Sequence, residues 1–389
     1  MPLFFGDSLS RNLTLTGVTL FEFFKNKNKA RNPVCPYDKA WSFRRLTLPI
    51  YPNKMIELCK YYNLEVIMLR VGVLGCGIIA AKVCDSLKGN AKVTVAGVAS
   101  RDKKKAKAFA SAHCPDAVVY SGYEALAKSS DIDLIYIATP NTFHYEHAIM
   151  CIKERKNVLI EKPFAMSLEE TENIFFEAKN RGVLVAEAMW TSYLPLHKVA
   201  LDWIAEGKIG QVKYVTANLG YAIENVPRLK SPTLGGGSYL DLGVYTTNFA
   251  LSFMGDDLKV SNVFVRTNEE GVDRDITYSL ETEDGSILGN FYVTMCANTD
   301  KDGAIIGEKG KIKFVNINNY RKVSLYSPDD VLLDEKEPEG DFLHGYVYEF
   351  ESCAKAISEG RIQATEMPWS RTVNIAKLSD AIRFVNIEG

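Results

Sequence analysis

Short apolar runs alternate with helical patterns between residues 68 and 188. The runs predict strands near 70–75, 93–99, 117–120, 133–138, 157–161 and 183–187. Helices fit between them, and two begin with Ser followed three residues later by Glu, the spacing of a capping box: Ser121 with Glu124, and Ser167 with Glu170. This alternation predicts an α/β fold, a doubly wound parallel sheet that binds its ligand at the carboxyl ends of the strands.

After Trp190 the pattern changes to consecutive strands. A helical stretch at 194–206 precedes alternating runs near 211–221, 259–267, 273–281, 286–297, 303–308, 311–316 and 321–326. Turn signals such as Glu283-Asp284-Gly285 separate these runs, which favours a mostly antiparallel sheet. Helical patterns return at 343–358 and 370–386. Residues 189–389 are therefore predicted to form an α+β domain, which follows a Rossmann domain at 68–188 in the sequence.

Residues 1–67 differ from the rest in charge. They hold ten Lys and Arg against five Asp and Glu, whereas the whole chain has a net charge of −2. We interpret them as an appended extension, either poorly ordered or the product of a start codon placed too far upstream. Organelle targeting stays open, although Asp7 and Glu22 fit a transit peptide poorly. Removing this extension is expected to leave activity and stability intact.

Composition narrows the class of protein. A chain of 389 residues exceeds one ordinary core, and 47% hydrophobic with 24% charged residues is typical of a soluble globular protein. A net charge of −2 argues against nucleic-acid binding, and no apolar run is long enough for a membrane span. Eight cysteines without a Cys-x-x-Cys pair indicate reduced thiols and a cytoplasmic protein. His144 and His147 have no Cys or acidic cluster beside them, so no metal site is expected.

The first predicted strand ends in a glycine turn, Gly75-Cys76-Gly77-Ile78-Ile79-Ala80. In a dinucleotide site the first glycine allows the tight turn, the second lets the backbone approach a pyrophosphate, and a small third residue packs the helix on the sheet. The helix that follows would direct its N–H groups at the phosphates. A glycine turn with no ligand is the alternative, but the strand and helix around it favour dinucleotide binding.

The end of the second strand indicates which cofactor is used. An NAD site usually has Asp or Glu there, whereas this chain has Ser100-Arg101, which suits a 2′-phosphate. NADP is favoured and NAD stays possible, because an ordinary solvated Arg would explain the same position.

Three further loops follow predicted strands, and together with the glycine turn they carry a resemblance. The loops read Thr139-Pro140-Asn141-Thr142-Phe143-His144, Glu161-Lys162-Pro163 and Glu187-Ala188-Met189-Trp190, and a later segment reads Gly235-Gly236-Gly237-Ser238-Tyr239-Leu240-Asp241-Leu242-Gly243-Val244-Tyr245. These motifs resemble the glucose-fructose oxidoreductase, inositol dehydrogenase and rhizopine-catabolism (GFO/IDH/MocA) family of NAD(P)-dependent oxidoreductases over about 68–389. Residues 187–191 and Val226-Pro227-Arg228 are most similar to its dihydrodiol and D-xylose dehydrogenase branch.

The chemistry of hydride transfer identifies candidates in these loops. Oxidation of an alcohol needs a base for the hydroxyl proton and a group that stabilises the developing alkoxide. Asp241 and Tyr245 are four residues apart and share one face of a helix. A free Tyr titrates near 10, so a nearby ammonium, for which Lys162 is the candidate, is expected to lower its pKa. A solvated Lys and a core Tyr are the alternatives.

The resemblance assigns roles to the candidates. It implies Lys162 and Tyr245 as the catalytic pair, Asp241 as an orienting group, and a cis peptide bond before Pro163. The cofactor-binding set that follows from the turn and the resemblance is Gly75, Gly77, Ile78, Ile79, Ser100, Arg101, Thr139, Asn141, His144, Glu161, Lys162 and Trp190. The substrate set is Trp190, Tyr193, Arg228, Asp241 and Tyr245. Other roles stay open for five of these residues. Asn141 would cap a helix, Glu161 would support its loop, and His144 would contact the site only indirectly. Trp190 and Tyr193 would belong to the core at the domain junction.

The expected function is NADP-dependent hydride transfer between nicotinamide and a CH–OH group of a sugar or trans-dihydrodiol. Many relatives carry His where this chain has Tyr245, which favours the dihydrodiol and xylose branch over an inositol substrate. A homodimer through the open sheet is implied by the resemblance. A non-catalytic dinucleotide sensor on the same fold is the alternative function.

Overall fold

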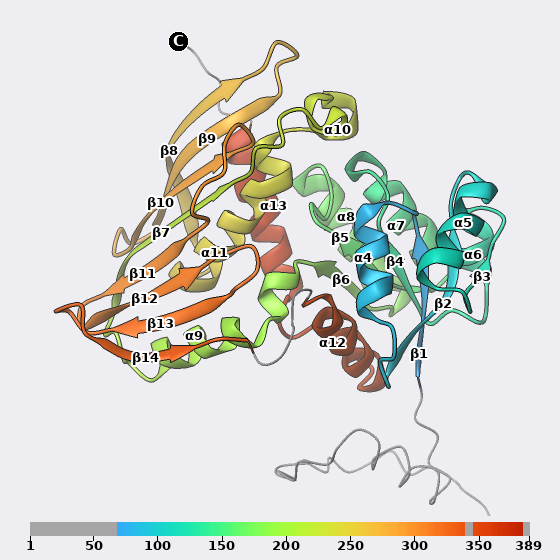
Figure 1. The fold of residues 1–389 in the computed structure, drawn as a ribbon, viewed down its shortest axis with the longest axis horizontal. Helices are drawn as coiled ribbons and strands as arrows, with labels where there is room; N and C mark the ends of the chain where they lie inside the picture. Colours follow the sequence, from blue (N-terminus) through green and yellow to red (C-terminus); the bar gives the residue numbers. More distant parts are fainter. Residues whose placement is uncertain (1–67, 339–344, 384–389) are drawn as a thin grey trace, which may run out of the picture. The chain divides into compact units, whose positions relative to one another are not determined.

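A computed structural model describes residues 68–338 and 345–383 (Figure 1). The predicted extension, residues 1–67, lies outside the described residues. The predicted boundary between residues 188 and 189 stays a prediction.

The first sheet is fully parallel, with strand order β3-β2-β1-β4-β5-β6. Its strands are β1 (Leu69–Leu74), β2 (Val93–Ala99), β3 (Val118–Val119), β4 (Leu134–Ile137), β5 (Asn157–Glu161) and β6 (Val185–Ala188). The chain reverses its winding direction between β1 and β4, which places a ligand crevice at the carboxyl ends of these two strands. The doubly wound prediction is confirmed, and all six strands lie within a few residues of their predicted positions.

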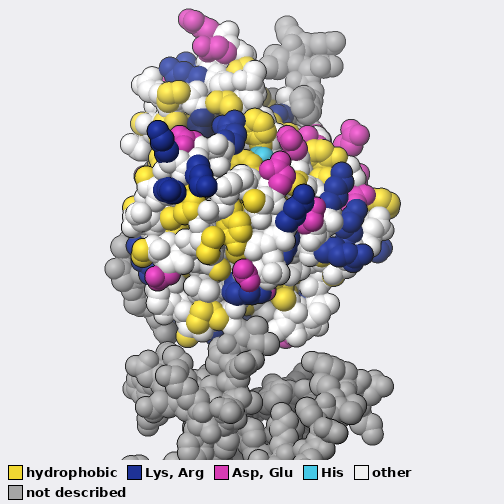
Figure 2. Space-filling model, turned by 90° about the vertical axis from the view of Figure 1, so that its right-hand side faces the viewer, with side chains coloured by type: hydrophobic (Ala, Val, Ile, Leu, Met, Phe, Trp, Pro, Cys, Tyr) yellow, Lys and Arg dark blue, Asp and Glu magenta, His cyan; other side chains and the backbone are white. Residues whose placement is uncertain are grey.

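Helices cover both faces of this sheet. They are α4 (Ile78–Ser86), α5 (Lys103–His113), α6 (Tyr123–Lys128), α7 (His144–Lys153) and α8 (Leu168–Arg181). Buried residues of α4 and α5 belong to one hydrophobic core and those of α6, α7 and α8 to another. Because helices bury both faces of the sheet, almost every position of its strands is apolar. On the side of the molecule seen in Figure 2, basic and acidic side chains are interspersed.

The second sheet has eight strands in the order β14-β13-β12-β11-β7-β10-β9-β8. They are β7 (Val212–Gly220), β8 (Leu258–Thr267), β9 (Asp273–Thr282), β10 (Leu288–Thr294), β11 (Gly303–Gly307), β12 (Gly310–Val315), β13 (Lys322–Tyr326) and β14 (Leu332–Lys336). Only the β7–β10 pair is parallel among these described strands, so the mostly antiparallel prediction is confirmed.

Helices pack on one face of the second sheet (Figure 1). The helices of this part of the chain are α9 (Pro195–Ala205), α10 (Pro227–Lys230), α11 (Val244–Met254), α12 (Tyr346–Ser358) and α13 (Trp369–Arg383). Helix α11 lies against β7 and β10, whereas α12 packs on the first sheet, where Phe350 meets Tyr136 edge to face at 5.3 Å. The end of the chain therefore helps to cover the parallel sheet.

Short turns connect these elements near the crevice. They are the 3₁₀ helices η1 (Asn141–Phe143), η2 (Trp190–Tyr193) and η3 (Pro232–Leu234), and the π-helical turn η4 (Tyr239–Gly243). The η4 turn leads directly into α11, so Asp241 and Tyr245 lie in one continuous helical segment, as predicted, although its first turn is wider than an α-helical turn.

Two expectations about helix starts have different outcomes. Ser167 accepts a hydrogen bond from the N–H of Glu170 and caps α8, as predicted. The Ser121 cap is wrong: α6 begins after Gly122, which adopts φ 100°, and Ser121 Oγ accepts instead from Lys103 Nζ at 2.9 Å. A glycine in this left-handed conformation turns the chain without a side-chain cap.

Candidate functional site

The glycine turn after β1 has the geometry of a phosphate-binding loop. Gly75 has φ 111°, and a Cβ there would lie 2.5 Å from the carbonyl oxygen of Ala138, so a side chain is excluded. A Cβ on Gly77 would meet nothing within 4 Å. Gly77 begins α4 without a side-chain cap or an acidic residue in the first turn, and Ile78 is 82% exposed. The open space and uncapped N–H groups fit a dinucleotide pyrophosphate.

A cavity of about 340 Å³ lies beside the end of β2. Arg101 is on its rim with its guanidinium carbon 5.7 Å from the centre of the Phe143 ring, whereas Ser100 is buried. Tyr123 and His147 line the same cavity and contact each other edge to face at 4.8 Å. This combination of flat rings and one guanidinium suits an adenine nucleotide that carries a phosphate.

The loop after β4 is held by backbone contacts to two other loops. His144 is buried, and its ring nitrogens lie 2.8 Å from the carbonyl oxygen of Pro163 and 2.9 Å from that of Thr139. Burial lowers the pKa of His144, so the neutral ring donates to one of these carbonyls. Asn141 Nδ2 donates to the carbonyl of Gly235 at 3.1 Å and does not act as a helix cap. His144 therefore supports the loops from within.

Lys162 follows β5 and reaches the π-helical turn η4. Its Nζ donates to the backbone carbonyl of Asp241 at 2.7 Å and lies 3.6 Å from Asp241 Oδ1. Arg228 Nη2 donates to the same Oδ1 at 2.8 Å. Burial alone would raise the pKa of Asp241, but the Lys162 and Arg228 cations hold it below its usual value. Asp241 is therefore a partly buried carboxylate with two cationic partners.

Tyr245 meets Lys162 in the same place. The ammonium lies 5.0 Å from the centre of the Tyr245 ring, and Tyr245 is 8% exposed. The expectation that the pKa of Tyr245 lies below its usual value is wrong. Burial raises that pKa well above its usual value, the nearby Glu161, Tyr346 and Asp241 raise it further, and the Trp190 side chain opposes the rise. Tyr245 therefore holds its proton tightly.

The peptide bond between Lys162 and Pro163 is cis, as the resemblance implies. Glu161, directly before it, is buried with its carboxyl group turned into the protein. Tyr136 donates its hydroxyl proton to Glu161 Oε1, and the N–H of Lys162 donates to Oε2 at 3.2 Å. Burial raises the pKa of Glu161 to about 7. These contacts agree with Glu161 as a support of the Lys162 loop.

Trp190 and Tyr193 lie in the packed interior. Trp190 is 6% exposed and stacks on Tyr346 of α12 with 4.6 Å between ring centres. Tyr193 donates its hydroxyl to the carbonyl of Glu187 at 2.9 Å. Both residues therefore lie in the packed core, and the Trp190 side chain is also next to Tyr245.

Sequence reasoning missed several residues near these groups. Tyr136 donates to Glu161 beside Lys162, Tyr346 stacks on Trp190, and Tyr123 and His147 line the cavity beside Arg101. Tyr136 lies inside a buried strand and Tyr346 far along the chain, so neither gives a local signal. His147 did give a local signal, because it follows Phe143 by four residues in the segment that leads from the loop into α7.

Family models match both parts of the chain. A model described as "Oxidoreductase family, NAD-binding Rossmann fold" matches residues 69–189, and the GFO/IDH/MocA C-terminal domain model matches 197–313. Among curated proteins, trans-1,2-dihydrobenzene-1,2-diol dehydrogenase from Xenopus laevis is 33% identical over 301 residues, which cover 74% of this chain and 88% of that protein. The enzyme of the same name from Homo sapiens is 30% identical over 252 residues, 64% of this chain and 75% of that protein.

Solved structures share the fold. A 3-ketoreductase from Actinomadura kijaniata, solved with NADP and TDP-benzene, superposes with a TM-score of 0.72 at 26% identity, over 81% of this chain and 97% of that one. An aldose-aldose oxidoreductase from Caulobacter crescentus gives a TM-score of 0.72 at 19% identity over 81% and 96%, a likeness that extends to the fold alone. Within the described residues, no helix has the length and apolar character to cross a membrane.

Proposed function

The chain belongs to the GFO/IDH/MocA family of dinucleotide-dependent oxidoreductases, and from this premise we propose a dehydrogenase that uses NADP and acts on a CH–OH group of a trans-dihydrodiol or sugar. The observation that carries the proposal is the meeting of Lys162, Asp241 and Tyr245 at one place, from two domains. The names of the curated relatives support a trans-dihydrodiol, and a sugar is the second substrate class.

Tyr245 is proposed as the acid and base of the reaction. In the oxidation direction the alcohol O–H proton would pass to the oxygen of deprotonated Tyr245 while the C–H hydride leaves for the cofactor, whose nicotinamide would supply the hydride acceptor. Reduction of a carbonyl reverses both transfers. The raised pKa of Tyr245 keeps the phenol protonated at neutral pH and suits proton donation to a carbonyl. Lys162, held by Asp241, places a positive charge where an alkoxide develops.

The proposed choice of NADP rests on Arg101. Its guanidinium lies at the rim of the aromatic cavity and has the charge for a 2′-phosphate, and the end of β2 carries no carboxylate to hold a ribose 2′-hydroxyl. Arg101→Ala is expected to weaken NADPH binding about tenfold and to leave NADH binding nearly unchanged, as fluorescence titration would measure.

The experiment that tests the function combines binding and turnover. NADPH is titrated by fluorescence, and NADP reduction is then followed with a panel of trans-dihydrodiols, aldoses and cyclic polyols. Turnover of a panel member supports the dehydrogenase. Tight NADPH binding without turnover of any compound contradicts it and supports the non-catalytic sensor.

A homodimer through the open face of the second sheet is also proposed. Phe264 of β8 is 63% exposed, and Tyr214 and Tyr292 of β7 and β10 are half-buried. Apolar side chains on a broad sheet favour pairing with a second copy. Light scattering after size exclusion is expected to give twice the chain mass, and Phe264→Asp to shift it toward the monomer. A cytoplasmic location is proposed from the unpaired cysteines of the described residues, five of which are buried.

A further inference from the structure

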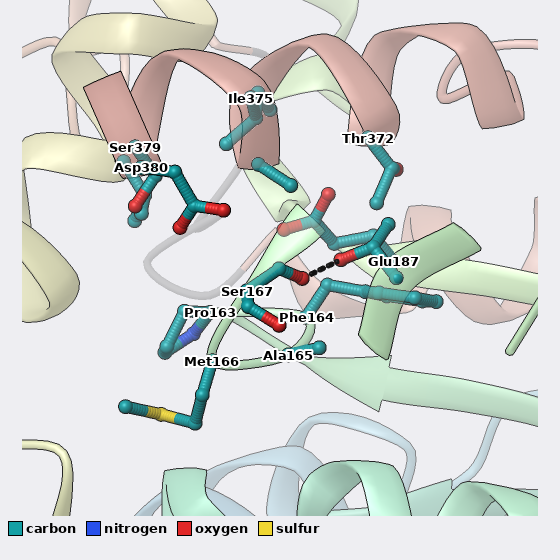
Figure 3. Close-up of a pocket in the computed structure, with 13 residues that line it drawn as sticks. Pro163, Phe164, Ala165, Met166, Ser167, Glu187, Thr372, Ile375, Ser379 and Asp380 are labelled. Carbon is teal, nitrogen blue, oxygen red and sulfur yellow. Dashed lines mark hydrogen bonds between the residues drawn. The ribbon is translucent and has the colours of Figure 1, made fainter. Parts of the chain in front are cut away.

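A second, smaller cavity lies behind the Lys162 loop. It has a volume of about 20 Å³ and lies between residues 163–167, strand β6 and helix α13 (Figure 3). A cavity of this size holds about one particle as large as a water molecule. Pro163 and Val244 line it, and they are the chain neighbours of Lys162 and Tyr245. The cavity is thus separate from the candidate active site but directly behind it.

Two carboxyl groups point into this cavity. Figure 3 shows Glu187 from β6 and Asp380 from α13 directed toward the same space. Glu187 is 1% exposed, and neither of its carboxyl oxygens makes a hydrogen bond. The Thr372 side chain and the Phe164 backbone lie near this carboxyl group. Oδ1 of Asp380 also has no partner, while its Oδ2 accepts from the N–H of Leu168 at 2.8 Å.

The rest of the polar lining consists of hydroxyl groups, those of Ser167, Thr171, Thr372 and Ser379. Among the described residues, those that line the cavity include no Lys, Arg or His. Thr171 already donates its hydroxyl proton to the carbonyl of Ser167 at 2.8 Å, and Ser167 Oγ accepts from the N–H of Glu170 at 3.2 Å. The cavity is therefore rich in oxygen lone pairs and has no positive side chain to balance its carboxyl groups.

We propose that one alkali-metal cation of sodium size occupies this cavity between Glu187 and Asp380. A buried carboxylate needs a positive partner, and hard cations prefer carboxylate and hydroxyl oxygens. A divalent ion is disfavoured, since Mg²⁺ keeps several waters for which there is no room and Ca²⁺ takes six to eight oxygens. The described residues contain no cluster of three or more His, Cys, Asp and Glu that could hold a metal ion, so hydroxyl oxygens of the lining would have to complete the coordination by the two carboxyl groups.

The cation would join α13 to the loop that carries Lys162. Two contacts already connect them: Asp380 accepts from Leu168, and Arg383 donates to the carbonyl of Met166 at 3.1 Å. A cation held by Glu187 of β6 and Asp380 of α13 would add a further connection between α13 and the parallel sheet. Because only the folded chain brings these residues together, the cation stabilises the folded state.

The test is thermal unfolding of the full-length protein in choline chloride and in sodium chloride at equal ionic strength. Sodium is expected to raise the unfolding midpoint by about 1–3 °C in a saturable way. Glu187→Gln is expected to lose this sodium-dependent rise. Glu169→Gln, which removes a carboxylate from the exposed first turn of α8, is the matched control and is expected to keep it.

Two results would overturn the proposal. One is an equal midpoint in both salts, which would mean that a proton or a water fills the cavity. The other is a sodium-dependent rise that Glu187→Gln retains, which would place the cation elsewhere. If Glu187→Gln does not fold, Asp380→Asn is measured in its place with the same two criteria. None of these measurements depends on turnover or on NADP.

Discussion

Two carboxyl groups near the Lys162-Pro163 loop, the partly buried Asp241 and the fully buried Glu187, have opposite electrostatic surroundings. Asp241 has two cations within 4 Å, Lys162 and Arg228, and its pKa is lowered despite burial. Glu187 has no side-chain cation against it in the described cavity, and burial raises its pKa to about 8. The comparison shows that burial alone does not set the charge of a carboxyl group in this protein. Neighbouring cations decide whether the carboxyl group is charged.

The two sides of the Lys162-Pro163 loop therefore differ in how their charges are balanced. On the Asp241 side the charges are balanced within the protein, so Lys162 is held in a fixed position beside Tyr245. On the Glu187 side no side-chain cation lines the cavity, so either a proton or the proposed cation balances the carboxyl group. The predictions below remove one partner at a time on the balanced side, with the largest expected effect first.

Tyr245→Phe removes the proposed acid and base and keeps every charge around Asp241. Turnover is expected to fall by about 10²–10⁴-fold. NADPH affinity and thermal stability should stay near those of the parent protein, because the ring and its packing remain. Steady-state kinetics together with fluorescence titration would measure both. Unchanged activity would exclude Tyr245 as the proton-transfer group.

Lys162→Met makes the surroundings of Asp241 more similar to those of Glu187. Only Arg228, whose side chain is 50% exposed, then faces the Asp241 carboxylate. We expect a loss of about 2 kcal/mol in the free energy of unfolding and a fall of about 10²-fold in turnover. Denaturant unfolding and kinetics check the two effects. A variant that loses activity at full stability would show that the ion pair does not stabilise the fold.

The sequence predicts the first sheet well because its signals are local. Apolar strands alternate with helices, and each strand is followed by a loop with polar or glycine residues, so Gly75, Thr139 and Lys162 could be placed at one edge. In the second sheet, β14 was missed. Most of its side chains are exposed, and an edge strand of this kind has no alternation of buried and exposed positions.

The sequence predicts which residues form the candidate site better than it predicts the groups that surround them. The motifs indicate Lys162 and Tyr245, but the raised pKa of Tyr245 depends on Glu161 and Tyr346, which the fold brings together from β5 and α12. The cavity between Glu187 and Asp380 joins residues almost two hundred positions apart, in a helix whose pattern gives no sign of a ligand. Such pairs follow from tertiary packing, which no local spacing encodes.

The raised pKa of Tyr245 predicts different pH dependence for the two directions of the reaction. Oxidation needs the deprotonated phenolate, so its kcat/KM should rise about tenfold per pH unit through neutral pH and continue to rise above pH 9. Reduction needs the protonated phenol and should be nearly independent of pH over the same range. Rate profiles in both directions, at saturating cofactor, measure this. An oxidation profile that levels off near pH 7 would mean that Lys162 lowers the Tyr245 pKa after all.

Arg228→Met removes the more exposed of the two cations and gives the smallest effect. Because its side chain is half exposed, solvent screens the Arg228–Asp241 pair, and Lys162 still holds the carboxylate. The free energy of unfolding should fall by less than about 1 kcal/mol, and kcat/KM by less than about fivefold. Denaturant unfolding of Arg228→Met beside Lys162→Met provides the direct comparison. If kcat/KM instead falls more than about fivefold while the free energy of unfolding stays nearly unchanged, Arg228 is assigned to substrate binding, the role that the sequence suggested for it.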